Sequence, residues 1–276
     1  MQCKSYSFLA LVALVALSSS LATGATLVIK GSDTLGAKLV PQMAEAFNSR
    51  AEQSGENLAI EIAAEGSATG IASVLDGTAD IGMLSRELRL SEIRQARARG
   101  LDLENIPVAR DALVVIVNEH NPLKSISSSD LAAIFNGDIQ NWAALTNWPG
   151  RISVYTRNSS SGTYVSFRKL ALQTRDYGEN ILKLAGNEQI AHEVANNPNA
   201  IGYVALAYAQ KPGIRALAVD EQLPKDTDYP LARPLYFLIN RSKESQPLRD
   251  KFVDFALSSK GQELAKRIQF LPANPK

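Results

Sequence analysis

Short apolar stretches alternate with amphipathic stretches along most of the chain. Thr26 to Lys30 is rich in β-branched residues and Leu58 to Ala64 alternates along its length, so both are predicted to be strands. Ile152 to Thr156 is a third stretch of this kind. Each is followed by a polar turn and then by a helical pattern. Strands that alternate with helices in this way are typical of parallel α/β sheets.

The longest apolar run extends from Ile106 to Asn118 and is interrupted by Arg110 and Asp111. Its high valine content is unusual for a surface helix and indicates a buried, extended segment. We interpret this segment as a crossing between two parts of the molecule.

The chain contains no internal repeat, low-complexity stretch or linker that would separate independent domains. Residues Leu217 to Pro234 are its most loop-like part. We therefore predict an α/β fold of two lobes, discontinuous in sequence and joined by a hinge of two crossing segments. Lobe 1 is expected to comprise residues 26–110 and 225–276, and lobe 2 residues 111–224.

The N-terminal residues 1–25 differ from the rest of the chain. Lys4 is followed by an unbroken apolar run from Phe8 to Leu17, and then by small and polar residues. This order is typical of a secretory signal peptide, cleaved after Ala22 or Ala25. The apolar run is too short for a transmembrane helix, which needs roughly 20 residues. We therefore expect the mature protein to be exported.

Charge and cysteine content exclude several classes of protein. The single cysteine, Cys3, lies in the predicted signal peptide, so the mature chain would have neither a disulfide nor thiol chemistry. The full chain has 29 basic and 28 acidic residues, and Lys4 is removed with the signal. A neutral chain does not attract nucleic acid or an anionic membrane. An anionic ligand would therefore be held by local geometry.

Three polar turns share one sequence context: a strand, then small hydroxyl residues with glycine, then a helix. They are Gly31–Thr34, Gly66–Gly70 and Arg157–Thr163. A helix N-terminus has unpaired N–H groups and a partial positive charge, which suit an oxyanion. Hydroxyl groups add hydrogen-bond donors, glycine allows close approach, and Arg157 adds a planar charged group. These turns predict an oxyanion site.

Each turn also has a purely structural interpretation. Serine and threonine are preferred helix N-caps, and Arg157 alone could be a surface salt-bridge partner. The concentration of hydroxyl residues in Asn158–Thr163 exceeds what one cap requires. The two histidines, His120 and His192, are far apart in sequence and lack metal-ligand spacing, and no nucleotide-binding or nucleophile-elbow motif is present. We therefore expect neither a metal nor a catalytic site.

Several motifs occur in an order that resembles the periplasmic phosphate-binding proteins of phosphate ABC importers. The resemblance extends from about Thr26 to the C-terminus, and the Arg157 segment is its most specific part. The motifs are Gly31-Ser-Asp-Thr-Leu35, Glu65-Gly-Ser-Ala-Thr-Gly70, Ala79-Asp-Ile-Gly-Met-Leu-Ser-Arg86, Asn121-Pro-Leu-Lys124, Leu131-Ala-Ala-Ile-Phe-Asn-Gly137, Arg157-Asn-Ser-Ser-Ser-Gly-Thr-Tyr164 and Ala200-Ile-Gly-Tyr203.

The resemblance implies a type II periplasmic-binding-protein fold, whose two lobes close on one phosphate without a metal or cofactor. It also implies which positions bind the anion. The expected binding residues are Thr34, Leu35 and Ser67 in lobe 1 and Arg157, Ser161, Gly162 and Thr163 in lobe 2, with Ser32 as a further candidate.

Two positions depart from the best-known members of this family, which have aspartate where this chain has Ser85 and Ser159. A carboxylate accepts the proton of hydrogen phosphate, whereas sulfate has no proton to donate, so the change at Ser85 bears on selectivity. Asp33 could supply the acceptor instead, or it could cap the following helix.

The resemblance implies a monomeric protein that binds inorganic phosphate and delivers it to a membrane permease, without catalysis. Three alternatives remain open from the sequence. The ligand could be another tetrahedral oxyanion, such as sulfate or molybdate; the role could be phosphate sensing or adhesion; or the protein could be a secreted phosphatase.

Overall fold

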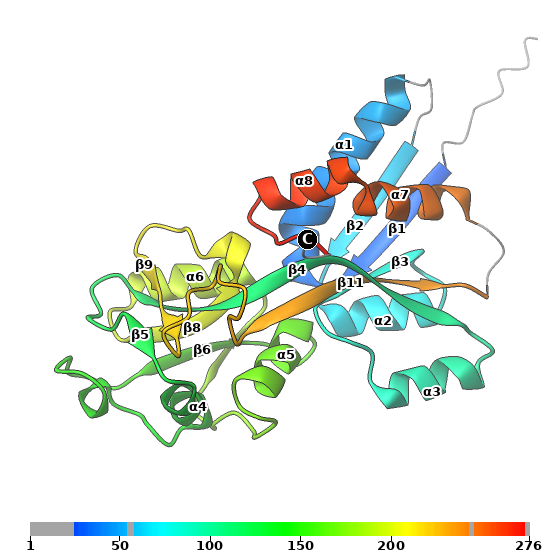
Figure 1. Ribbon diagram of the computed structural model, residues 1–276. Coiled ribbons are helices and arrows are strands. Elements are labelled where there is room, and N and C mark those ends of the chain that lie inside the picture. The colour runs from blue at the N-terminus through cyan, green and yellow to red at the C-terminus, as the bar shows by residue number, and fades with distance from the viewer. Residues whose placement is uncertain (1–24, 54–57, 243–245, 274–276) are drawn as a thin grey trace, which may run out of the picture.

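The computed structural model describes residues 25–53, 58–242 and 246–273. It shows two lobes joined by a pair of long antiparallel strands, β4 (Leu103–Asn118) and β11 (Ala232–Asn240) (Figure 1). The predicted signal peptide, including Cys3, lies outside the described residues, apart from the backbone of Ala25. No helix in the described ranges has the length and apolar content needed to cross a bilayer.

One half of the molecule contains the N-terminal strands and the C-terminal helices. β1 pairs in parallel with both β2 and β3, and β3 pairs in turn with the crossing strand β11. The elements are β1 (Ala25–Gly31), β2 (Leu58–Ala64), β3 (Ile81–Leu84), the π-helix η1 (Leu35–Leu39), α1 (Val40–Gln53), α2 (Ser67–Leu75), α3 (Leu90–Ala98), α7 (Pro247–Leu257) and α8 (Ser259–Arg267).

The other half continues the same sheet. The strand order is β2-β1-β3-β11-β4-β8-β6-β7, with β9 also paired to β4, and a separate two-stranded sheet is formed by β5 and β10. The elements are β5 (Ser125–Ile126), α4 (Ser128–Asn136), η2 (Trp142–Ala144), β6 (Ser153–Arg157), α5 (Gly162–Leu170), β7 (Leu182–Leu184), α6 (Asn187–Asn196), β8 (Ala200–Ala205), η3 (Leu206–Tyr208), β9 (Ile214–Ala216) and β10 (Ala218–Val219).

Each half has its own large hydrophobic core. One core is built from residues between Ala112 and Leu231. The other combines residues from Leu27 to Ala109 with residues from Leu235 to Phe270. On both crossing strands the change from one core to the other therefore occurs within a few residues.

The sequence suggested that Leu217–Pro234 is loop-like. The structure differs at the end of this segment, because β11 already begins at Ala232. Pro234 is tolerated in this strand since it faces Arg110, whose backbone N–H and C=O bond to Leu271 instead. A proline at such a position leaves no ladder hydrogen bond unmade. The sequence around Pro234 could not reveal this pairing.

Pro41 lies in the helical pattern that follows the first polar turn. The structure places it as the second residue of α1, immediately after the π-helix Leu35–Leu39. A proline lacks the N–H that an α-helix interior requires. Here it lies directly after a π-turn, in which the N–H of Val40 bonds to the carbonyl of Leu35, within a helical run that extends from Asp33 to Gln53.

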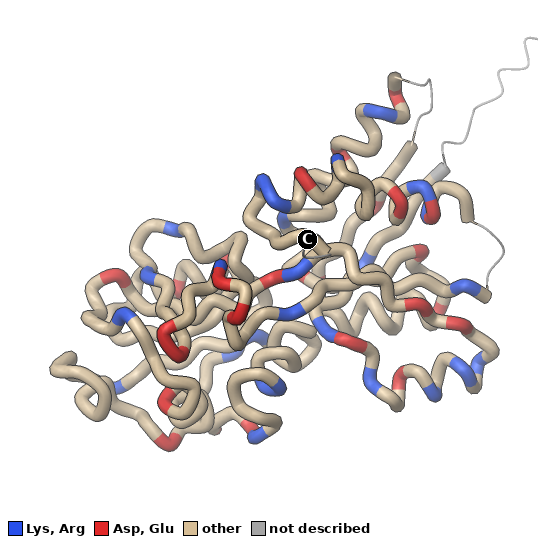
Figure 2. Tube along the Cα trace, viewed as in Figure 1, with Lys and Arg blue, Asp and Glu red and all other residues tan. Residues whose placement is uncertain are grey.

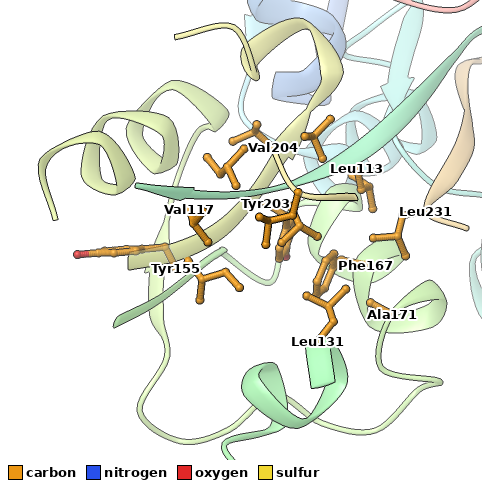
Figure 3. Packing of buried hydrophobic residues seen from close by; sticks show 14 of the residues in the cluster. Leu113, Val117, Leu131, Tyr155, Phe167, Ala171, Tyr203, Val204 and Leu231 are labelled. Carbon is orange, nitrogen blue, oxygen red and sulfur yellow. The ribbon is translucent and has the colours of Figure 1, made fainter. Parts of the chain in front are cut away.

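The core of the second half is held together by stacked aromatic rings. Phe167 and Tyr203 are fully buried and parallel, with ring centroids 3.8 Å apart (Figure 3). Phe135 packs 4.7 Å from Phe167. Because Phe167 belongs to α5, this stack fixes the helix whose N-terminus faces the other half of the molecule.

We expect Phe167→Ala to lower the free energy of unfolding by about 3–5 kcal/mol, because it leaves a cavity beside Tyr203. Denaturant titration followed by circular dichroism would measure this. Leu90→Ala is the control, since Leu90 is 73% exposed and its truncation should change the unfolding free energy little. Equal losses in both variants would contradict the assigned packing.

Candidate anion-binding site

The three polar turns predicted from the sequence lie against one another where the two halves meet. The backbone N–H of Gly66 donates to the carbonyl of Gly31 (2.7 Å), and that of Ala68 donates to the carbonyl of Ser160 (3.1 Å). Thr34 and Thr163, from opposite halves, share a hydrogen bond between their hydroxyl groups (3.0 Å). Tertiary structure thus assembles one site from segments more than a hundred residues apart.

The hydroxyl groups of the first half form a buried cluster. Ser32 and Ser85 are hydrogen-bonded through their Oγ atoms. The Oγ of Ser67 accepts a hydrogen bond from the backbone N–H of Ser85 (2.9 Å). All three residues are at most 2% exposed. Ser85, which directly follows β3, is thus hydrogen-bonded to one serine from each of the first two polar turns.

Arg157 is anchored to its own half by two hydrogen bonds. Its Nε and Nη2 donate to the carbonyl of Ala185 at 3.0 and 2.6 Å. Its Nη1 lies 3.1 Å from Asp33 Oδ2, across the interface, but without the alignment of a hydrogen bond. Burial lowers the pKa of Arg157 from its ordinary value, and the carboxylate of Asp33 opposes that shift. Nη1 is thus a buried cationic N–H with no hydrogen-bond acceptor among the described residues.

Asp33 does not cap the helix that follows it. Its Oδ2 accepts hydrogen bonds from the backbone N–H (3.2 Å) and the side-chain Nδ2 (2.7 Å) of Asn187, the first residue of α6. Asn187 in turn accepts a hydrogen bond from Ala205 N and lies 3.4 Å from Thr34 Oγ1. Asp33 therefore connects the two halves and partners Arg157.

The turn before α5 combines a structural and a potential binding role. The Oγ of Ser161 accepts from the backbone N–H of Thr163 (3.1 Å), so Ser161 is the N-cap of α5, while its own O–H remains available to donate. A Cβ added at Gly162 would lie 2.9 Å from the Cβ of Ser67 and 3.1 Å from the carbonyl carbon of Ser85. Gly162 is therefore required for the two halves to approach this closely.

Leu35, the remaining predicted residue, opens the π-helix η1 and is fully buried. Its backbone N–H belongs to the helix N-terminus that follows Thr34, where N–H groups lack an intrahelical acceptor.

Sequence reasoning missed three polar residues at this site: Arg233, Asp111 and Asn187. Arg233 Nη2 lies 3.0 Å from Thr163 Oγ1, and Arg233 Nη1 lies 3.2 Å from the carbonyl oxygen of Ser85. Its Nε and Nη2 donate to Asp111 Oδ2 at 3.2 and 2.9 Å. For Arg233 and Asp111 the available signal was a charged residue within an otherwise apolar strand. For Asn187 the sequence offered no such signal.

The local charges balance. Arg157 and Arg233 are matched by Asp33 and Asp111, and burial raises the pKa of Asp111 and lowers that of Arg233 while each charge opposes the other's shift. Figure 2 likewise shows basic and acidic segments interspersed on both halves. The site can therefore surround an anion with donors without a strongly charged surface.

The hydrogen bonds of the two histidines go to residues outside this arrangement. The ring nitrogen of His120 contacts Asn118, and His192 contacts Asn196 in an exposed position on α6. Within the described ranges no group of three or more His, Cys, Asp or Glu side chains could hold a metal ion. The converging groups include guanidinium and hydroxyl donors, a chemistry that suits an oxyanion.

Comparisons with known proteins agree with this description. The model of the PBP superfamily domain matches residues 18–260. The phosphate-binding protein PstS of Pseudomonas aeruginosa is 30% identical over 88% of this chain and 81% of its own length. PstS of Borreliella burgdorferi is 27% identical over 87% of this chain and 88% of its own length.

Solved structures share the fold. A substrate-binding protein of Clostridium perfringens, crystallised with bound phosphate, superimposes with a TM-score of 0.81 at 26% identity and covers 90% of this chain and 99% of its own. An ABC-type phosphate transport receptor of Vibrio cholerae gives a TM-score of 0.72 at 25% identity, covering 89% and 99%.

Fold and site together define a two-lobed solute-binding protein rather than an enzyme, and the expected type II periplasmic-binding-protein fold is confirmed. The chain belongs to the PBP superfamily and, within it, to the family of the phosphate-binding proteins called PstS.

We expect Gly162→Ala to prevent the close approach of the two lobes, because the new methyl group would overlap Ser67. Alanine suits a helix, so the fold itself should be kept. Small-angle X-ray scattering at saturating oxyanion should give a larger radius of gyration than for the unmodified protein. Arg168→Ala, a half-exposed position on the same helix whose side chain pairs with Asp176, should leave the radius unchanged. Identical radii for all three proteins would contradict the assigned contact.

Proposed function

We propose that this protein is exported, binds inorganic phosphate between its two lobes and delivers it to the membrane permease of an ABC importer. The observation that carries the proposal is the buried Nη1 of Arg157, which has no hydrogen-bond acceptor among the described residues and lies 3.1 Å from Asp33, the residue between the buried Ser32 and Thr34. The named function of the relatives and the phosphate in the Clostridium perfringens structure support it. The Vibrio cholerae receptor supports the link to ABC transport.

The proposed phosphate-binding residues come from both lobes, together with two helix N-termini. They are Thr34, Leu35, Ser67, Arg157, Ser161, Gly162 and Thr163, with Ser32, Asp33 and Ser85 completing the surroundings. Asp33 is assigned the role of orienting Arg157, because its Oδ2 is already shared by Arg157 and Asn187.

The proposed mechanism is capture by closure. Residues 26–110 and 225–276 were expected to form one lobe and residues 111–224 the other. Because Tyr229 and Leu231 pack in the core of the second lobe, we place the second boundary near residue 232, and the lobes rotate about β4 and β11. Each charge-assisted hydrogen bond contributes about 1.5–3 kcal/mol, and micromolar affinity corresponds to about 8 kcal/mol. A few such bonds therefore suffice for micromolar affinity, and the free energy of any further bonds offsets the cost of desolvation and lobe closure. The closed form is what the permease would recognise.

Ser85 determines how sharply phosphate is distinguished from sulfate. Its hydroxyl, paired with that of Ser32, can accept the proton of hydrogen phosphate, but it can also rotate and donate to sulfate. A carboxylate could only accept. We therefore infer a preference for phosphate that is weaker than a buried carboxylate would give.

We also propose how the protein is exported and in which state it acts. Residues 1–25 would act as a signal peptide, cleaved near Ala22 or Ala25, and the mature protein would be a periplasmic monomer.

Isothermal titration calorimetry of the mature protein with phosphate, sulfate, arsenate and molybdate tests the function. We expect phosphate to bind at micromolar concentration and sulfate more weakly. Phosphate affinity no better than millimolar would refute the proposal. Sulfate binding equal to that of phosphate would show that the Ser85 hydroxyl does not discriminate, and steady hydrolysis of p-nitrophenyl phosphate would indicate a phosphatase instead.

Arg157→Gln should weaken phosphate binding by at least about 2 kcal/mol, because it removes a charge-assisted contact that is buried at the site. The same titration measures this, and thermal unfolding without ligand verifies folding. Arg151→Gln is the matched control, since Arg151 is exposed and bonds only to Gln140 in the described structure (3.3 Å). An unchanged affinity in Arg157→Gln would make the arginine structural.

A further inference from the structure

Arg233 and Asp111 occupy the boundary between the two hydrophobic cores. On β4 the first core ends at Ala109 and the second begins at Ala112. At the start of β11 the boundary falls between Leu231, just before the strand, and Leu235 within it. Asp111 and Arg233 are direct partners in the antiparallel register of these strands. The ion pair they form (2.9 Å) therefore lies at the hinge, where the strands cross between the lobes.

The side chain of Arg233 extends from this boundary to hydroxyl groups of both lobes. Its Nη2 is 3.0 Å from Thr163 Oγ1 and 3.5 Å from Thr34 Oγ1. Its Nη1 donates to the carbonyl of Ser85 (3.2 Å). Arg233 is only 4% exposed, so its charge acts in a low-dielectric environment directly behind the proposed phosphate site.

The groups around Thr34 and Thr163 determine which way the two threonine hydroxyl groups can donate. A guanidinium can only donate, and so can Nδ2 of Asn187, which lies 3.4 Å from Thr34 Oγ1. Thr163 and Thr34 must therefore act as acceptors toward these groups, and their own O–H protons must point elsewhere. One proton serves the bond between the two hydroxyls (3.0 Å), and the other remains as a donor.

We propose that Arg233 is a positioning and specificity residue of the anion site. Its guanidinium donates to Thr34 and Thr163 and so leaves one of their two hydroxyl protons as a donor to the bound anion, while Asp111 holds Arg233 at the hinge. The guanidinium, and not its partner carboxylate, contacts the threonine hydroxyl groups, so the ion pair presents its positive end to the site and favours the dianion of phosphate over the monoanion. This inference rests on the proposed phosphate-binding function.

A purely structural role predicts different behaviour. A buried ion pair that only joins β4 to β11 would affect folding stability, and its loss would change the affinity for both charge states of phosphate equally. A charge that serves recognition changes the ratio between them. The dependence of affinity on pH across the second ionisation of phosphate therefore separates the two roles.

Removal of Arg233 alone leaves the buried charge of Asp111 unpaired, and such a variant could fail to fold. The double variant Asp111→Asn/Arg233→Met avoids this problem. Asparagine keeps an oxygen that can accept the hydrogen bond from Leu206 N, which Asp111 Oδ1 accepts at 3.0 Å. Replacement of a buried pair by neutral groups is often close to neutral for stability.

The experiment is calorimetric titration of the mature protein and its variants with inorganic phosphate, from below to above the second ionisation of phosphate. We expect the double variant to fold and to bind the dianion about tenfold more weakly or worse, with a flatter pH dependence. Arg233→Lys should recover part of the affinity, because it keeps the charge without the planar fork.

Two further measurements complete the test. The effect of the double variant should be smaller in a Thr163→Val background, since Arg233 is inferred to act through this hydroxyl. Arg110→Met is the matched control: adjacent side chains of a strand point to opposite faces, so binding should be unchanged. Wild-type affinity and pH dependence in the folded double variant would overturn the inference, whereas absence of phosphate binding by the unmodified protein would refute the proposed function itself.

Discussion

The requirement that buried charges be paired governs how this molecule is assembled. Arg157 is 1% exposed and faces Asp33 across the interface between the lobes, so each lobe contributes one charge to a pair that neither can complete alone. An unpaired buried charge costs several kcal/mol, whereas a pair with extra hydrogen bonds is tolerated. Closure of the lobes is therefore coupled to the electrostatics of the site.

The sheet explains why these groups meet. Parallel strands bring their C-terminal ends to the same edge, and β1 and β6 both end in a turn followed by a helix N-terminus. The two crossing strands then set the lobes so that these edges face each other. Glycine at positions such as 162 removes the bulk that would keep the turns apart. Binding by geometry, without net charge, follows from this arrangement.

Much of the fold was predictable because it depends on local patterns. The strands at Leu58–Ala64 and Ile152–Thr156, and the long buried run that became β4, followed from periodicity and composition. The start of β11 did not, since Pro234 argues locally against a strand and only its long-range register with Arg110 permits one. Asp33 likewise looked like a helix cap, and only the packing of α6 shows it partnering Asn187 and Arg157.

The sequence by itself determined the α/β class, the three hydroxyl-rich turns and the arginine at the start of the third, because each is encoded in neighbouring residues. Their binding roles stay predictions. Tertiary structure alone decided that Arg233 and Asp111 join the site, that Asn187 orients Asp33, and that Gly162 contacts Ser67. These relations link residues distant in sequence, and no local pattern records which distant residue a side chain will meet. The Arg157 segment thus predicted an oxyanion as the ligand, and the packing around it determined which side chains lie close enough to bind one.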